Sequence, residues 1–150
     1  MGKTWLIVAF VLTGTRVASA CRELERTPHL AKDVIRFHDR IFVVTVTELT
    51  QRQADSHRYA PPFSMKGAIT AVLKGSEKIG DEILAETTSG EEAHAVCPIA
   101  LETGKTYLLF LRGNAAPYKI PRYGTPYLDD HDPHFKTYRD DIKKARENGH

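Results

Sequence analysis

The chain has little cysteine, no long hydrophobic run and no excess of either charge. Only two of its 150 residues are cysteines, so a scaffold held by several disulfides is excluded. The longest apolar run extends from Trp5 to Leu12, well short of the ~20 residues that a membrane-spanning helix needs. The Gly-x-Ser-x-Gly, His-Glu-x-x-His and glycine-rich phosphate motifs are also missing. The sequence therefore predicts a protein that is not an enzyme and needs no cofactor.

The first twenty residues have the pattern of a secretory signal. Lys3 precedes the apolar run, and Ala18 and Ala20 occupy the two small-residue positions that signal peptidase recognises. This pattern predicts a signal over residues 1–20, with cleavage before Cys21 and a secreted, extracellular or periplasmic product. The alternative is a fortuitously apolar start on a cytosolic protein.

A cysteine directly after the cleavage point also fits a second export route. Bacterial lipoproteins are cleaved before a cysteine that is then acylated. That class usually carries leucine three residues before the cysteine, where this chain has Ala18. The two routes leave different products, because acylation would block the amino group of Cys21 and anchor the chain to lipid.

The 130 residues after the predicted cleavage, 21–150, have the length and charge of one soluble domain. Of the 21 lysines and arginines, Lys3 and Arg16 belong to the signal, which leaves 19 basic residues against 19 acidic ones. A nucleic-acid surface needs a basic excess, which this balance does not supply. We therefore expect a single domain that does not bind nucleic acid, and we expect it to be a monomer.

The two cysteines, Cys21 and Cys97, leave two alternatives open. In an oxidising compartment an isolated pair most simply forms one disulfide. A bridge between them would close a loop of 76 residues. In the chain-entropy model such a bridge would contribute roughly 4.5 kcal/mol to the stability of the fold. In the lipoprotein alternative Cys21 is acylated and Cys97 remains a free thiol.

Hydrophobic periodicity predicts helices near both ends of the domain, with strands between them. The expected elements are a helix over about 28–38, strands over 41–49, 63–74, 81–88 and 106–111, a short strand near 119–122, and a helix starting at Asp132 and Pro133. The rest of 113–126 is expected to be an ordered loop. The last helix has an apolar stripe formed by Phe135, Tyr138, Ile142 and Ala145. These elements predict a mainly β fold, a small antiparallel barrel of OB type with flanking helices, although another α+β sheet is an alternative.

The strand over 63–74 has the clearest alternation of the chain. Its expected inward row consists of Phe63, Met65, Ile69, Ala71 and Leu73. Gly67 interrupts this row, and a glycine at such a position predicts a bulge or a sharp bend.

Three stretches resemble successive parts of one family. Asp39–Val46 is similar to its first barrel strand, and Phe63–Gly75 is similar to a strand that ends in a Lys-Gly pair. Ala95–Phe110 resembles its cysteine followed by a Gly-x-x-Tyr-Leu-Leu strand. The family is that of the netrin-like domains, which includes the tissue inhibitors of metalloproteinases. The resemblance covers about residues 21–112 and implies a five-stranded, OB-like barrel.

The resemblance also implies an activity and a set of site residues. In these inhibitors the mature chain begins with a cysteine that is bonded to one at the position of Cys97, which implies a bridge between Cys21 and Cys97. The α-amino and carbonyl groups of Cys21 would chelate the zinc of a target protease. Arg22 would enter the specificity pocket, with Ala95 and Val96 beside it.

This chain departs from the inhibitors in two ways that bear on that activity. Glu23 stands where the inhibitors have a second cysteine, and Arg22 stands where they have a small residue. A fold can be inherited without its activity. The alternative function is therefore an extracellular or cell-envelope interaction module, acylated on Cys21 in the lipoprotein case, that inhibits nothing.

Two further stretches carry weaker hypotheses. His131, Asp132 and His134 have metal-ligand side chains at close spacing, but Asp132 is equally suited to cap the helix that follows. The aromatic and proline-rich stretch from Tyr118 to Tyr127 could form a binding patch, or it could be a loop packed on the barrel.

Overall fold

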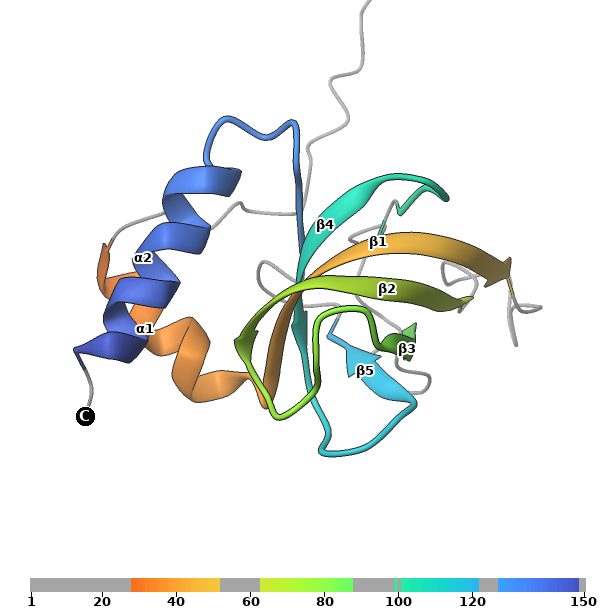
Figure 1. The fold of residues 1–150 in the computed structure, drawn as a ribbon, viewed down its shortest axis with the longest axis horizontal. Helices are drawn as coiled ribbons and strands as arrows, with labels where there is room; N and C mark the ends of the chain where they lie inside the picture. The colour runs from red at the N-terminus through yellow and green to blue at the C-terminus, as the bar shows by residue number, and fades with distance from the viewer. Residues whose placement is uncertain (1–27, 52–62, 88–98, 100, 122–126, 149–150) are drawn as a thin grey trace, which may run out of the picture.

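The computed structural model describes residues 28–51, 63–87, 99, 101–121 and 127–148. Within these ranges the fold is mainly β, as the sequence predicted, with a curled six-stranded sheet and two helices (Figure 1). The elements are α1 (Pro28–Phe37), β1 (Arg40–Gln51), β2 (Phe63–Lys74), β3 (Glu82–Thr87), β4 (Thr106–Leu111), β5 (Tyr118–Ile120), β6 (Tyr127–Asp129) and α2 (Phe135–Glu147).

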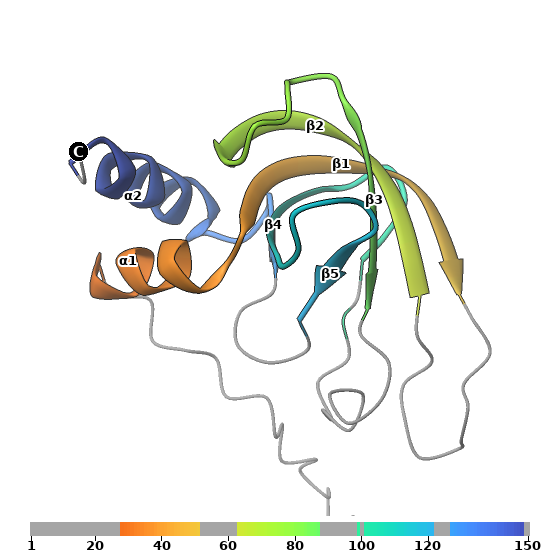
Figure 2. The same cartoon turned by 90° about the horizontal axis from the view of Figure 1, so that it is seen from below.

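The strands of this curled, half-barrel sheet are not paired in chain order. The order is β5-β3-β2-β1-β4-β6, with β5 parallel to β3 and all other neighbours antiparallel. Arg112, directly after β4, also bridges Lys119 in β5 by two backbone hydrogen bonds of 2.9 and 2.8 Å. The pairings thus return from β5 to the end of β4, and Figure 2 shows the resulting curl.

The strand β4 and the first half of the long strand β1 are buried on both faces. Phe42 and Val44 of β1 point into the curled sheet, whereas Ile41 and Val43 point toward the helices. All four side chains are buried. Burial on both faces explains the continuous apolar runs in these two strands, because neither strand has a solvated side to alternate with.

The inward row predicted for β2 is wrong beyond Ile69. Val43 of β1 pairs with Ala71 and Val44 pairs with Ile69, so Thr70 is an extra residue that forms a bulge. Its hydroxyl donates to the carbonyl oxygen of Val43 at 3.2 Å. After the bulge the two faces of β2 exchange. Ala71 and Leu73 therefore pack in a second apolar cluster, which the helices cover, instead of in the barrel interior.

The bend predicted at Gly67 is confirmed, although the extra residue lies in the partner strand. Val46 pairs with Gly67 and Glu48 with Lys66, which leaves Thr47 of β1 unmatched. A Cβ atom on Gly67 would lie 2.4 Å from Val44 Cγ1, a distance that real Cβ atoms essentially never show. Glycine is therefore required here by the close approach of β1.

The two helices lie together on the outer face of the sheet (Figures 1 and 2). They cover a second apolar cluster formed by Val34, Ile41, Val43, Leu73, Leu108, Phe110, Leu128, Phe135, Tyr138 and Ile142. The three buried residues of α2 belong to its predicted apolar stripe. The helix-covered cluster and the barrel interior thus share the strands β1 and β4.

The Lys-Gly pair that ends β2 has a clear structural role. Lys74 Nζ donates to the carbonyl oxygens of Ile35 and His38, both at 2.7 Å, and so holds the C-terminal end of α1. Gly75 has a φ of 143°, in the region that favours glycine. A Cβ atom there would also lie 2.8 Å from Arg40 Cδ.

The start of the last helix differs from the prediction by two residues. The N-cap position is His134, whose side chain makes no capping hydrogen bond. Asp132 instead closes the preceding turn, where its carboxylate accepts the backbone N–H of His134 and its carbonyl accepts that of Phe135. Asp132 therefore supports the helix start without being its cap residue.

Candidate functional site

The residues predicted to contact a partner lie outside the described part of the chain. Cys21 and Arg22 fall within residues 1–27, and Ala95, Val96 and Cys97 fall within 88–98. The bridge between Cys21 and Cys97 therefore stays a prediction. What the structure does describe is the part of the barrel that joins these segments.

Residues 52–62 and 88–98 are joined to neighbouring strands at one end of the barrel, which we call the groove end. There Gln51 at the end of β1 pairs with Phe63 at the start of β2. The backbone N–H of Phe63 donates to Thr87 Oγ1 at 3.0 Å, which ties the start of β2 to the end of β3. Both connections therefore have ends in one three-stranded corner.

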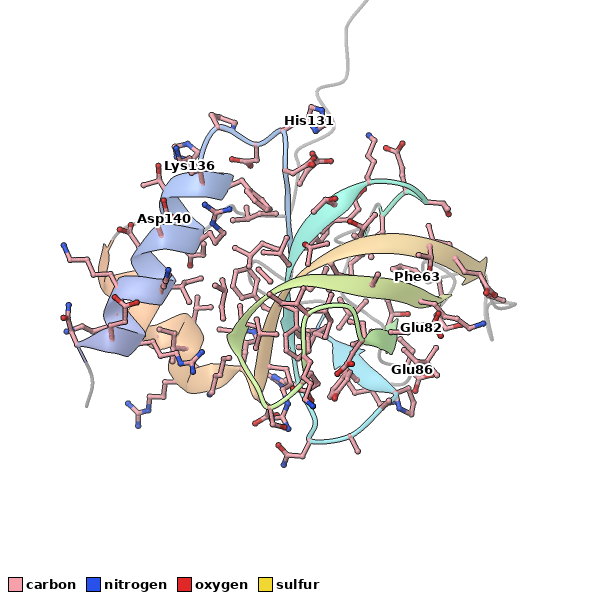
Figure 3. The ribbon with its side chains drawn as sticks, viewed as in Figure 1. Phe63, Glu82, Glu86, His131, Lys136 and Asp140 are labelled. Carbon is pink, nitrogen blue, oxygen red and sulfur yellow. The ribbon has the colours of Figure 1, made fainter. Side chains whose placement is uncertain are left out.

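A groove of about 300 Å³ lies at this end, and the side chains that line it within the described residues are apolar. It is lined by Leu49, Phe63, Ile99 and Leu101. The same four side chains belong to or pack against the barrel interior, so the groove is continuous with the core. Its walls come from β1, β2 and the chain before β4, and Phe63 is labelled at the start of β2 in Figure 3.

A buried tyrosine fixes one wall of the groove. Tyr107 OH accepts the backbone N–H of Glu102 at 3.0 Å, which holds the residue next to Leu101 against β4. Burial raises the pKa of Tyr107, although its bond to Glu102 acts in the opposite direction. The hydroxyl consequently stays protonated at neutral pH and holds the residue beside Leu101 as a neutral hydrogen-bond acceptor.

Asp129, Asp130 and His131 form the one group of three or more metal-ligand side chains that converge within the described residues. His131 Nδ1 lies 2.6 Å from Asp130 Oδ1 and 3.2 Å from Asp129 Oδ1. The hydrogen bond to Asp130 is the largest influence that raises the pKa of His131. This shift favours the protonated ring, which cannot bind a metal through Nδ1.

The metal hypothesis on His131, Asp132 and His134 therefore gains little from the structure. Asp129 and Asp130, which are outside the predicted set of ligands, are the residues that approach His131, whereas Asp132 is occupied in the turn before α2. The run of ligand-type residues from 129 to 131 was the available signal. Figure 3 shows His131 in the connection into α2, far from Phe63 at the groove end.

A partly buried polar network lies at the opposite end of the barrel. Glu77 Oε1 accepts hydrogen bonds from Arg40 Nε at 2.9 Å and from Tyr118 OH at 2.5 Å. Burial would raise the pKa of Glu77, but these bonds outweigh burial and lower it to about 2. The network therefore joins β1, β5 and the turn after β2.

The stretch from Tyr118 to Tyr127 is at least partly core. Tyr118 and Ile120 are buried in the barrel interior, and the Tyr118 ring meets Phe42 edge-on at 6.1 Å. Tyr127 packs edge-on against Tyr107 at 5.7 Å. The described residues of this stretch therefore favour packing over a free binding patch, while residues 122–126 lie outside the described chain.

Comparison with protein-family models and with curated proteins found no match. Within the described residues, neither helix is long and apolar enough to cross a membrane.

Proposed function

We propose that the chain is an exported, non-enzymatic binding domain, similar to the tissue inhibitors of metalloproteinases, that acts on a protein partner through its groove end. The partner class that the resemblance implies is a zinc metalloprotease. In this proposal Cys21 chelates the protease zinc through its α-amino and carbonyl groups, and Arg22 occupies the specificity pocket. Ala95 and Val96 lie beside them, and a bridge to Cys97 fixes the terminus.

One observation carries the proposal. Two described residues flank the segment that contains Ala95, Val96 and Cys97. Thr87 lies beside the start of β2, and Ile99 lies in the wall of the groove. An inhibitor that presents this segment together with the 52–62 connection needs both to leave from adjacent strands. The four apolar side chains in the described lining of the groove suit a protein partner, because the centres of protein interfaces are enriched in apolar groups.

The barrel type in this proposal is a five-stranded OB barrel with β6 added to its edge. Support comes from the cycle of pairings β1-β2-β3-β5-β4, in which β5 is parallel to β3. The Arg112–Lys119 bridge joins β5 to the end of β4. A rigid barrel of this kind would lower the ordering cost of the loops that it presents.

The test is an inhibition assay with the purified chain 21–150 against a panel of zinc metalloproteases. We expect inhibition at micromolar concentration or below, and we expect its loss when one extra alanine precedes Cys21, because the added residue removes the chelating amine. Replacing Leu49 by Ser should weaken inhibition without abolishing it. If the unmodified chain leaves the whole panel uninhibited, the inhibitor proposal is wrong.

The second candidate is an envelope or extracellular interaction module without zinc chemistry. It is favoured by Arg22 and Glu23, which differ from the inhibitors at the two positions after the terminal cysteine. Acylation of the amino group of Cys21 would decide for this alternative, because an acylated amine cannot chelate zinc.

A further inference from the structure

A small set of polar contacts holds the C-terminal end of α1, in addition to the packing of Val34 in the helix-covered cluster. His38, the residue after α1, donates from Nδ1 to the carbonyl oxygen of Val34 at 2.9 Å. Lys74 holds the carbonyl oxygens of Ile35 and of His38 itself. The end of the helix is therefore fixed by one imidazole and one ammonium group.

The His38 ring lies against the helix-covered cluster. It packs at 5.6 Å on Phe110, a fully buried residue of β4, and Tyr138 of α2 meets the same phenylalanine at 5.9 Å. His38 thus joins α1 to the layer that β4 and α2 share. Because Nδ1 is the donor to Val34, an added proton must go to Nε2.

The charges that face this ring are mostly positive. Lys74 approaches from β2 and Arg112 from the end of β4, and both oppose a charge on the imidazole. Asp39, the next residue, favours one, but its carboxylate also accepts the backbone N–H of Gly113 at 2.7 Å. A charged His38 would therefore lie between two cations and beside an apolar cluster.

We infer that His38 is an acid-sensitive latch on α1, so that protonation of its ring weakens the docking of the helix on the sheet. Burial of the ring is the largest cause that lowers the pKa of His38, and repulsion from Arg112 and Lys74 adds to it. The hydrogen bond to Val34 and the charge of Asp39 act in the opposite direction, but the net effect is a lowered pKa. In the released helix the ring regains its ordinary pKa of about 6.5. When the pH falls through about 6.5, the undocked helix therefore becomes more favourable relative to the docked one. This relative free energy stops changing once the pH is below the pKa of the docked ring.

The consequence concerns the segment that precedes α1. Residues 21–27 lead directly into the helix, and the proposed bridge from Cys21 to Cys97 would keep this segment attached to the barrel when α1 loosens. The latch itself depends only on α1 and the sheet, and it holds whether or not the chain binds a metalloprotease.

Native-state hydrogen exchange of the chain 21–150, followed by NMR at about pH 7.5 and about pH 5.0, tests the latch. The opening equilibrium of α1 amides, such as those of Val34 and Ile35, is compared with that of Leu108 in β4 after correction for intrinsic exchange rates. We expect this ratio to rise about threefold to tenfold in acid, because release takes up a proton.

Two variants make the result specific. H38Q cannot be protonated and should remove the pH dependence, whereas H131Q, which changes an exposed histidine elsewhere, should retain it. A ratio that does not change with pH, or that rises equally in H38Q, would overturn the inference. If H38Q does not fold, direct NMR titration decides, because a His38 ring that titrates at or above about 6.5 also contradicts the latch.

Discussion

The barrel interior and the helix-covered face are built on the same two strands but are closed in different ways. The interior is enclosed by strands whose pairings run from β5 around to β4. The outer face is covered by α1 and α2, and cationic side chains hold both helices: Lys74 binds the end of α1, and Arg146 of α2 donates to the carbonyl oxygen of Leu73. The difference suggests that the helices can loosen while the barrel persists.

The largest expected effect comes from opening a cavity in either cluster. Phe42→Ala in the interior and Phe110→Ala beneath the helices each remove a fully buried ring and should lower the free energy of unfolding by about 3–5 kcal/mol. The two variants should differ in which amides they expose. Phe110→Ala should increase amide hydrogen exchange in α1 and α2 more than in β2, whereas Phe42→Ala should increase it in all the strands. Urea denaturation and hydrogen exchange measure both, and equal patterns in the two variants would count against separable helices.

The polar network at the far end of the barrel gives the next effect. The pKa of Glu77 is lowered from 4.5 to about 2, so its contribution is present above about pH 4.5 and is lost as the pH falls toward 2. Glu77→Gln should cost on the order of 2 kcal/mol at neutral pH and flatten this acid dependence. Glu48→Gln is the matched control, because it breaks an exposed pair with Lys66 and should change stability very little.

Gly67 tests how closely β1 and β2 approach in the barrel. Gly67→Ala should cost about 1–3 kcal/mol, because the added carbon overlaps Val44 and the Thr45 carbonyl oxygen. Gly104→Ala separates space from backbone conformation, since nothing lies within 4 Å of its added carbon but its φ is 85°. Thermal unfolding of the two variants should show the larger loss for Gly67, and the reverse order would refute the close-approach argument.

Lys74 tests the helix-covered face alone. Lys74→Met retains the aliphatic stem but loses both hydrogen bonds to the end of α1, at a cost of about 1–2 kcal/mol. Amide exchange should rise in α1 and stay unchanged in β3. Equal increases in α1 and β3 would show that the helix end is not a separate unit.

The smallest effect concerns the histidine in the connection into α2. The pKa of His131 is raised by Asp130 first and then Asp129, so its pairing stabilises the fold below about 6.5 and is lost as the pH rises through the folded pKa. An NMR titration should show His131 changing above its ordinary value and His38 below it. The opposite order would contradict both assignments.

The predictable parts of the fold are those that local patterns specify. The boundaries of β2 and β4 follow directly from their apolar and β-branched runs. The bulge at Thr70 did not, because Ala71, Val72 and Leu73 are all apolar and carry no signal of register. The three-residue strand β6 was missed because tertiary pairing with β4 forms it, not its own sequence.

The candidate site shows the same limit. The Arg40–Glu77–Tyr118 network joins residues 37 and 41 positions apart, and no local pattern indicates such a contact. The groove likewise combines Leu49, Phe63 and Ile99 from three parts of the chain. Cys21 and Cys97 were proposed from resemblance and cleavage pattern, and they lie outside the described residues.

The intact mass of the native mature protein, with and without reduction, tests the proposed form of the terminus most directly. We predict the mass of residues 21–150, two hydrogens lighter until reduction, which would establish a free amine on Cys21 and its bridge to Cys97. A mass increased by acyl groups, or one that reduction leaves unchanged, would contradict the bridge, and acylation would also remove the amine that zinc chelation requires.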